Sequence, residues 1–271
     1  MTGIVYLVGA GPGAADLLTL RAARLLERAD IVFHDALVPD EVLFLSGKAI
    51  KIKVGKRSGR YSTAQAFINK RLVDAARKYQ RVVRLKGGDP MLFGRAHEEI
   101  AYLRKKRVRV EIVPGVTAAL AAAAELAVSL TRRGLARSVV FLTPRSGAGE
   151  RPNEWANAAL AADTVAIYMG TGEAGEISRA LVAAGKSPAT PAVMVENASL
   201  PDVRRFFGTL ATLESVAAAG SGGPALILLG EVYRGSAIIT AWRDTQPSGE
   251  QSSSLPTARS TRSGRARSSS S

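Results

Sequence analysis

The chain has 271 residues, of which 46% are hydrophobic, and this is enough to bury one substantial core or two smaller ones. It contains no cysteine and only two histidines, so disulfides, thiolate metal sites and a cysteine nucleophile are excluded, and we expect no metal site. The net charge of +14 is typical of a protein that binds an anionic partner, although solubility alone explains such a charge equally well.

Strand-like and helix-like segments alternate along most of the chain, which indicates an α/β protein. We expect Asp16 to cap the first helix, Ser62 to open the next with a capping box, and Thr117 to cap an alanine-rich helix. Strands are predicted at residues 4–8, 31–33, 82–85, 108–112, 139–142, 164–169, 192–195 and 225–229, and further helices at residues 98–106 and 176–184.

The alternating region is long for a single sheet, and Pro114-Gly115 is a natural hinge within it. We therefore predict an α/β fold of two α/β domains with a ligand cleft between them. The N-terminal domain would cover residues 1–114 and the C-terminal domain residues 115–241. Residues 242–271 are rich in serine and arginine with almost no large apolar side chain, so a disordered basic tail is expected there.

Two classes of partner are disfavoured by the pattern of residues. The first residues enter a strand-like run with no basic or long apolar leader, and the most apolar stretch, residues 116–130, is too short and too weakly apolar to span a membrane. Aromatic residues make up only 6% of the chain and do not interleave with basic ones. We expect a cytoplasmic enzyme that binds neither a membrane nor nucleic acid.

Three motifs rich in glycine and proline follow predicted strands. GAGPGA at residues 9–14 matches a dinucleotide fingerprint, so an NAD(P)-binding Rossmann oxidoreductase is an alternative, although Pro12 lacks the N–H that a pyrophosphate cradle uses. KGGDP at residues 86–90 puts two glycines and Asp89 at a strand end, where a ligand can approach the main chain. VPGVTA at residues 113–118 is a strand exit followed by a helix start with free N–H groups.

Together these motifs resemble the tetrapyrrole methylase family. Their order and spacing match, as do FGR at residues 93–95 and VGKR at residues 54–57, and the resemblance covers about residues 3–235. Within the family the chain looks most like enzymes that C-methylate uroporphyrinogen III to precorrin-2. The resemblance implies S-adenosylmethionine as methyl donor, S-adenosylhomocysteine as product, a pathway toward sirohaem, cobalamin or haem d1, and a homodimer. A methylase of a later corrin intermediate and a non-catalytic basic binding module are the remaining alternatives.

The resemblance also assigns roles to individual residues. Asp35 and Lys56 match proposed acid–base groups, with a turn residue and a solvated cation as their alternative interpretations. The S-adenosylmethionine contacts fall on Pro12, Gly87, Gly88, Asp89, Leu92, Thr117, Ala118, Met169, Ala198 and Ala225. The contacts to substrate carboxylates and pyrrole N–H groups fall on Arg95, Glu98, Arg132 and Arg133.

The chain departs from the usual residues of the family on the expected substrate side. The departures are His34, Ala96, His97, Arg132, Pro144 and Arg145. They bear on the choice of substrate more than on the choice of methyl donor.

Overall fold

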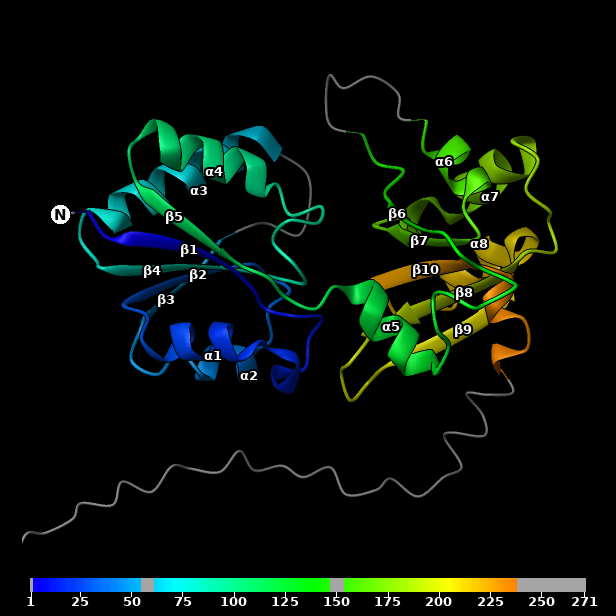
Figure 1. Cartoon of the computed structure of the whole chain (residues 1–271), viewed down its shortest axis with the longest axis horizontal. Helices are drawn as coiled ribbons and strands as arrows, with labels where there is room; N and C mark the ends of the chain where they lie inside the picture. The colour runs from blue at the N-terminus through cyan, green and yellow to red at the C-terminus, as the bar shows by residue number, and fades with distance from the viewer. Residues whose placement is uncertain (1, 55–60, 147–153, 238–271) are drawn as a thin grey trace, which may run out of the picture.

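The computed structural model describes residues 2–54, 61–146 and 154–237, and its strands form two five-stranded sheets (Figure 1). The strands are β1 (Ile4–Gly9), β2 (Ile31–His34), β3 (Ile50–Lys53), β4 (Arg81–Lys86), β5 (Arg109–Val113), β6 (Val139–Leu142), β7 (Thr164–Tyr168), β8 (Pro191–Glu196), β9 (Arg204–Thr209) and β10 (Ala225–Gly230). The helices are α1 (Leu20–Glu27), α2 (Asp40–Phe44), α3 (Tyr61–Ala76), α4 (Ala96–Lys105), α5 (Ala118–Leu126), α6 (Trp155–Ala161), α7 (Ala174–Ala183) and α8 (Leu213–Ala218).

The first sheet is parallel throughout, with strand order β3-β2-β4-β1-β5. Helices α3 and α4 cover one face, and α1 and α2 cover the other (Figure 1). Because both faces are covered, β2 and β4 are buried almost without interruption. In the dinucleotide-binding order 3-2-1-4-5-6 the first two strands are neighbours. Here β4 lies between them, so the Rossmann alternative does not fit this sheet.

The second sheet is mixed, with strand order β6-β7-β10-β8-β9. Only β6 and β7 are parallel, and the other pairs are antiparallel. Helix α5 packs on one face, and α6, α7 and α8 pack on the other. Tyr168 pairs with Leu226 and Glu196 pairs with Ala225, so the ends of β7 and β8 and the start of β10 share one edge of the sheet.

The predicted α/β class with two sheets is confirmed, and each strand predicted from the sequence is present. The sequence pattern does not predict β3, β9 and the helices α2, α6 and α8. Both missed strands lie at sheet edges and are half exposed, so neither shows the continuous apolar run of a buried strand. Among the described residues, no helix is long and apolar enough to cross a membrane.

The prediction that Asp16 caps the first helix is wrong. Asp16 lies in a 3-10 turn at Ala15–Leu17, and the chain is extended at Leu18. The cap is Thr19, whose hydroxyl accepts a hydrogen bond from the Ala22 N–H at 3.2 Å. Helix α3 already includes Tyr61, so Ser62 lies inside the helix and the prediction that it opens the helix with a capping box is wrong. The expected tail at residues 242–271 lies outside the described residues.

Candidate functional site

The loops that follow β1, β4 and β5 meet at the carboxyl edge of the first sheet. Gly11 and Gly88 form an isolated antiparallel bridge, in which the Gly88 N–H donates to the Gly11 carbonyl at 2.7 Å. A Cβ on Gly115 would lie only 2.4 Å from the Gly88 carbonyl oxygen and 2.8 Å from the Gly9 Cα. Close packing of the loops therefore requires the glycine at position 115.

Gly87 differs from these glycines, because nothing in the described protein requires it. Its backbone is not left-handed, it is exposed, and an added Cβ would meet only the Leu37 Cβ at 3.8 Å. A glycine that neither the backbone nor the packing requires leaves room for a ligand to approach the main chain.

The Asp89 carboxylate ties these loops together. Oδ1 accepts a hydrogen bond from the Met91 N–H at 2.7 Å, and Oδ2 accepts one from the Gly115 N–H at 2.9 Å. The sequence suggested only a ligand contact for this residue. Each oxygen retains a second lone pair, so Asp89 can bind a ligand hydroxyl while it also holds the loops.

Tyr168 connects the second sheet to the start of α5. Its hydroxyl lies 2.6 Å from the Thr117 hydroxyl and accepts a hydrogen bond from the Ala119 N–H at 3.2 Å. Thr117 occupies the predicted N-cap position, but its side chain does not cap the helix, and the Tyr168 hydroxyl binds the helix N–H instead. The Tyr168 ring packs 5.0 Å from the Phe93 ring. Burial raises the pKa of Tyr168, so the hydroxyl stays protonated.

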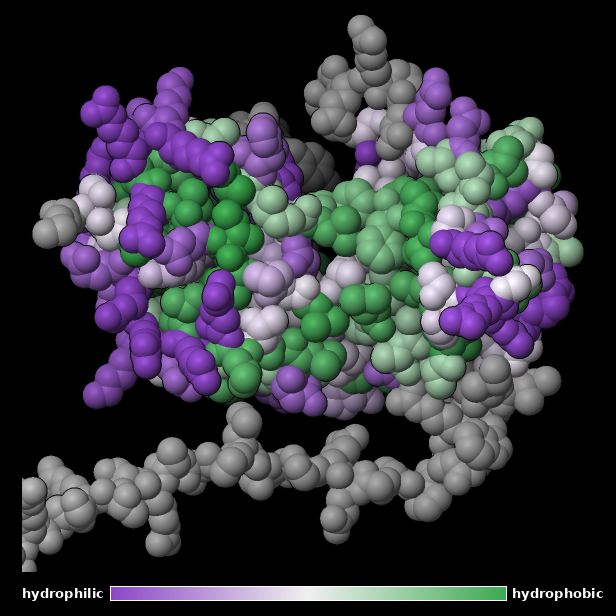
Figure 2. Space-filling model, in the orientation of Figure 1, coloured by the Kyte–Doolittle hydropathy of each residue, from purple (hydrophilic) through white to green (hydrophobic). Residues whose placement is uncertain are grey.

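Left-handed backbone at non-glycine residues is concentrated where the two sheets meet. These residues are Phe93 (φ 52°), Arg95 (φ 55°), Met169 (φ 57°), Asn197 (φ 54°) and Ser199 (φ 71°). Such conformations cost about 1–3 kcal/mol each and cluster at functional sites. The Ser199 hydroxyl accepts a hydrogen bond from the Ala14 N–H at 3.1 Å, which joins the loops of the two sheets. We call these loops, at residues 9–14, 86–95, 113–119, 168–170 and 197–200, the interdomain junction. Hydrophobic residues gather where the two lobes meet (Figure 2).

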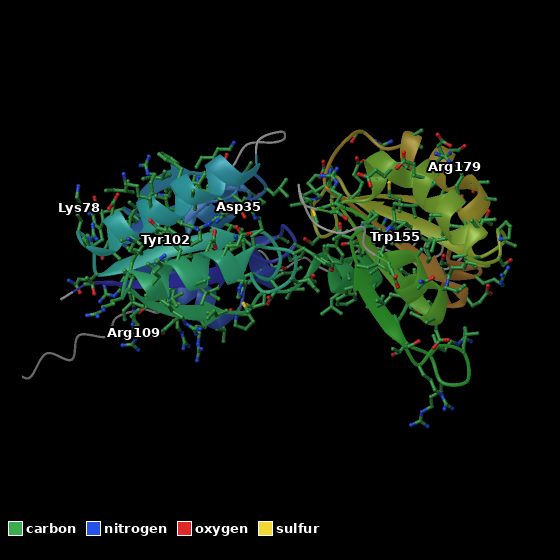
Figure 3. All side chains as sticks on the ribbon, turned by 90° about the horizontal axis from the view of Figure 1, so that it is seen from above. Asp35, Lys78, Tyr102, Arg109, Trp155 and Arg179 are labelled. Atoms are coloured by element: carbon green, nitrogen blue, oxygen red, sulfur yellow. The ribbon has the colours of Figure 1, made fainter. Side chains whose placement is uncertain are left out.

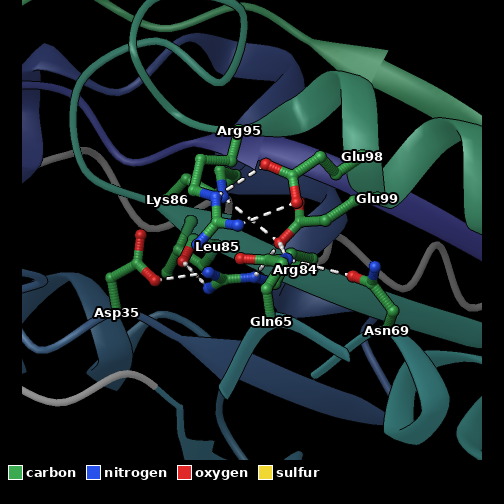
Figure 4. Close-up of polar contacts among 9 residues, drawn as sticks. All are labelled: Asp35, Gln65, Asn69, Arg84, Leu85, Lys86, Arg95, Glu98 and Glu99. Carbon is green, nitrogen blue, oxygen red and sulfur yellow. Dashed lines mark hydrogen bonds and ion pairs between the residues drawn. The ribbon is translucent and has the colours of Figure 1, made fainter. Parts of the chain in front are cut away.

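A buried cluster of charged and amide side chains lies at the ends of β2 and β4 (Figure 4). The Arg84 guanidinium forms an ion pair with Asp35, and its Nε lies 3.1 Å from Glu99 Oε1. The same carboxylate oxygen accepts hydrogen bonds from Lys86 Nζ at 3.3 Å and Gln65 Nε2 at 3.2 Å. We call these five residues the Glu99 cluster. Its two cations are balanced by two carboxylates, and such pairing is what buried charges require.

The surroundings shift the pKa values of the two cations of the cluster in opposite directions. Burial lowers the pKa of Arg84, but the adjacent Asp35 and Glu99 carboxylates outweigh it and raise that pKa overall. Burial and the nearby Arg84 charge lower the pKa of Lys86, and Glu99 offsets only part of this effect. Asp35 is the member of the cluster that reaches outward, with its side chain 30% exposed. It lies toward the second sheet, whereas Lys78 and Arg109 lie at the far end of the first (Figure 3).

The predicted substrate-binding residues lie on two separate segments of the chain. Arg95 and Glu98 form a bidentate pair at the start of α4, with nitrogen–oxygen distances of 2.7 and 2.8 Å, and this pairing lowers the pKa of Glu98. Arg132 and Arg133 lie on an exposed hairpin closed by the bridge between Arg132 and Ala136.

The other predicted contacts to the methyl donor fall on both sides of the junction. Pro12 and Leu92 are half-buried in the loops after β1 and β4. Met169 follows β7 and is 41% exposed, Ala198 is buried after β8, and Ala225 begins β10. Lys56 lies outside the described residues.

Four residues of the site have no role predicted from the sequence: Arg84, Lys86, Glu99 and Tyr168. A signal for the cluster was present in the sequence. Arg84 and Lys86 are two residues apart in a strand whose other residues after Arg81 are apolar, so both point to one face and require a buried carboxylate.

Comparisons with known proteins place the chain in a family. The family model for Tetrapyrrole (Corrin/Porphyrin) Methylases matches residues 4–214. A siroheme synthase from Chromobacterium violaceum is 46% identical over 232 residues, which are 85% of this chain and 49% of the relative. The chain thus spans about half the length of the curated relatives it matches.

Solved structures of a uroporphyrin III C-methyl transferase from Thermus thermophilus are similar over most of both chains. The native form has a TM-score of 0.75 and 39% identity, and covers 86% of this chain and 94% of that one. The complex with S-adenyl homocysteine has a TM-score of 0.75 and 40% identity over the same shares. From the family match and these similarities, the chain belongs to the tetrapyrrole (corrin/porphyrin) methylases.

Proposed function

We propose that the chain transfers methyl groups from S-adenosylmethionine to carbon atoms of uroporphyrinogen III, giving precorrin-2. Family membership and the similarity to a uroporphyrin III C-methyl transferase support the reaction class. The observation that carries the proposal is the junction itself. Strained loops from both sheets meet at the junction, and at Gly87 in one of these loops the described protein leaves open the space that a side chain would fill.

The residues at the junction fit S-adenosylmethionine, which supplies a methyl group on an activated sulfonium when bound. Gly87 and Gly88 would allow the ligand to approach the main chain, and Asp89 has a lone pair free on each oxygen for ribose hydroxyls. Met169 would offer apolar surface to the adenine. Pro12, Leu92, Thr117, Ala118, Ala198 and Ala225 complete the proposed set.

Asp35 and the Arg95–Glu98 pair would act on the tetrapyrrole. Arg95 can hold a substrate carboxylate bidentately, and Glu98 can accept hydrogen bonds from pyrrole N–H groups. Methylation of a ring carbon requires a proton to leave the ring system, and the Asp35 carboxylate, which pairs with Arg84, is proposed to accept it. Positioning would supply most of the rate, because the methyl group arrives already activated. Lys56, Arg132 and Arg133 are proposed as further groups that act on the substrate.

We also propose that the domains divide at residues 114 and 115 and that the protein is a homodimer. The end of β5 at Val113 and the packing of α5 on the second sheet support the boundary. Exposed apolar side chains, Leu120 on α5 and Leu135 after it, are candidates for a dimer interface. Analytical ultracentrifugation of the full chain tests the dimer, and a single monomeric species at micromolar concentration would contradict it.

Parallel titrations with S-adenosylhomocysteine, NAD and RNA test the class of function. We expect S-adenosylhomocysteine to bind in calorimetry and to raise the melting temperature with dose, because a ligand of the native state stabilises it by mass action. NAD and RNA should do neither. Binding of NAD without binding of S-adenosylhomocysteine would refute the methylase proposal, and binding of RNA alone would favour a basic binding module.

A further inference from the structure

We propose that Glu99, acting through Arg84, is a positioning residue that fixes the Asp35 carboxylate in place and sets its charge. The inference rests on the proposed role of Asp35 in the methylation reaction. It extends that proposal to two buried residues, Arg84 and Glu99, which lie behind the residues proposed to touch the methyl donor or the tetrapyrrole.

The Arg84 guanidinium is held from three directions. Nη2 donates to Asp35, Nε donates to Glu99 Oε1 at 3.1 Å, and Nη1 donates to the Leu85 carbonyl at 3.1 Å. A planar fork bound on three sides has little freedom to rotate. Asp35 is therefore bound by a donor whose position is set by Glu99 and the strand, and not by solvent.

Glu99 is the centre of this arrangement. Its Oε1 accepts hydrogen bonds from Arg84, Lys86 and Gln65, while its Oε2 is buried with no hydrogen-bond partner among the described residues. An unpaired carboxylate oxygen in the interior lowers stability. Buried ion pairs contribute little net stability on average, so stability alone is a weak explanation for four charges at this place.

The Glu99 cluster also fixes where Asp35 lies relative to the proposed substrate-binding residues. Glu99 is in the first turns of α4, directly after Arg95 and Glu98. The loop before α4 packs on the cluster, since a Cβ on Gly94 would lie 3.1 Å from the Lys86 Cε. A movement of Glu99 would therefore shift Asp35 and the start of α4 against each other.

Charged and titratable side chains from β2, β4 and α4 surround Asp35 in the described chain. Arg84 contacts it from β4, Lys86 lies farther along the same strand, and Glu99 lies behind both on α4. His34 precedes it on β2, with Nδ1 3.1 Å from the Asp35 carbonyl oxygen. Only Arg84 makes direct contact with the carboxylate within that described part, so Arg84 has the largest direct effect on its charge.

Two substitutions should shift the acidic limb of the plot of kcat against pH in opposite directions. Arg84→Gln removes the cation that favours ionised Asp35, so activity should be lost at a higher pH, by about 1 unit or more. Glu99→Gln keeps the shape but removes the anion that competes with Asp35 for Arg84, so the limb should move to a lower pH. Lower stability alone would not displace the limbs in opposite directions. Asn69→Ala is the matched control, because Asn69 is buried and uncharged and contacts Gln65 at the edge of the cluster.

The same displacement can be followed without turnover. The Asp35 carboxyl signal in ¹³C NMR, assigned with Asp35→Asn, should change its titration midpoint upward in Arg84→Gln and downward in Glu99→Gln. Midpoints that stay in place or move together would overturn the inference. If they move apart while the wild-type enzyme methylates no tetrapyrrole, the positioning role stands and the proposed function fails.

If both glutamine variants fail to fold, Arg84→Lys provides the test. It keeps the positive charge but loses the three-way fork, so kcat should fall about tenfold or more while the limb stays in place and the S-adenosylhomocysteine affinity is unchanged. An Arg84→Lys enzyme with the wild-type kcat would overturn the inference.

Discussion

Replacement of Gly87 by alanine tests whether a ligand approaches the main chain at this position, because the substitution should weaken ligand binding without lowering the stability of the fold. The added Cβ would meet only the Leu37 Cβ at 3.8 Å, an ordinary van der Waals contact, and the backbone there suits any residue. We expect the free energy of unfolding to stay unchanged or to rise by about 0.4–1 kcal/mol, because alanine has less freedom than glycine in the unfolded chain. The ligand, in contrast, loses the space that the methyl group fills. Crowding of this kind costs about 1–3 kcal/mol, so the Kd for S-adenosylhomocysteine should rise about 5- to 150-fold.

Gly115→Ala is the matched control at the same junction. Its Cβ would lie 2.4 Å from the Gly88 carbonyl oxygen and 2.8 Å from the Gly9 Cα, and these backbone atoms cannot move aside cheaply. We expect the free energy of unfolding to fall by about 3 kcal/mol or more. Thermal unfolding and calorimetry with S-adenosylhomocysteine should be run on both variants. An unchanged Kd in Gly87→Ala would show that the ligand does not approach this edge, and unfolding of Gly87→Ala like that of Gly115→Ala would show that the space is not open.

Three further predictions follow from the hydrogen bonds and charges of the site. Asp89→Ala should lower the free energy of unfolding and weaken S-adenosylhomocysteine binding, each by about 1–3 kcal/mol. Arg95→Ala should leave that binding intact and impair the kinetics of tetrapyrrole methylation. If calorimetry and steady-state assays gave the opposite pattern, the two assignments would have to be exchanged. Tyr168→Phe should lower the free energy of unfolding by about 1 kcal/mol in chemical denaturation, and no change would show that its two hydrogen bonds contribute nothing. Burial opposes ionisation of Glu196, but backbone hydrogen bonds and Arg204 outweigh it and lower its pKa below 4.5. Its stabilising contribution is thus present above pH 4.5 and is lost as the pH falls through the lowered pKa. Glu196→Gln should therefore flatten the acidic side of a plot of melting temperature against pH, and parallel plots would contradict this.

The central strands of both sheets could be predicted from the sequence, whereas two of the four edge strands, β3 and β9, could not. Residues 82–85 are apolar apart from Arg84, and two glycines follow Lys86, so this segment predicted β4 within a residue or two. In β3, lysines alternate with isoleucines at an edge where much of the strand is exposed, and its sequence resembles a loop as much as a strand. The first helix was given the wrong cap because Asp16 and Thr19 are both good caps, and only the extended backbone at Leu18 decides between them.

The site was predictable as a set of loops but not as a set of contacts. The glycines and Asp89 mark strand ends, where α/β proteins bind ligands, so the sequence identified the right loops. The pairing of Asp35 with Arg84 joins residues 49 positions apart, and that of Thr117 with Tyr168 joins residues 51 apart. Such partners follow from strand order, which local spacing does not reveal. For the same reason, Asp89 was given only a ligand role although it also holds the Gly115 loop.

Transfer of a labelled methyl group to the tetrapyrrole tests the central claim most directly. The full chain would be incubated with uroporphyrinogen III and S-adenosylmethionine labelled in its methyl group, and the products would be analysed by mass spectrometry. We predict a tetrapyrrole product that gains mass in whole labelled methyl groups, with one S-adenosylhomocysteine formed for each. Binding of S-adenosylhomocysteine without any label in uroporphyrinogen III, or transfer only to a later corrin intermediate, would contradict the proposed reaction.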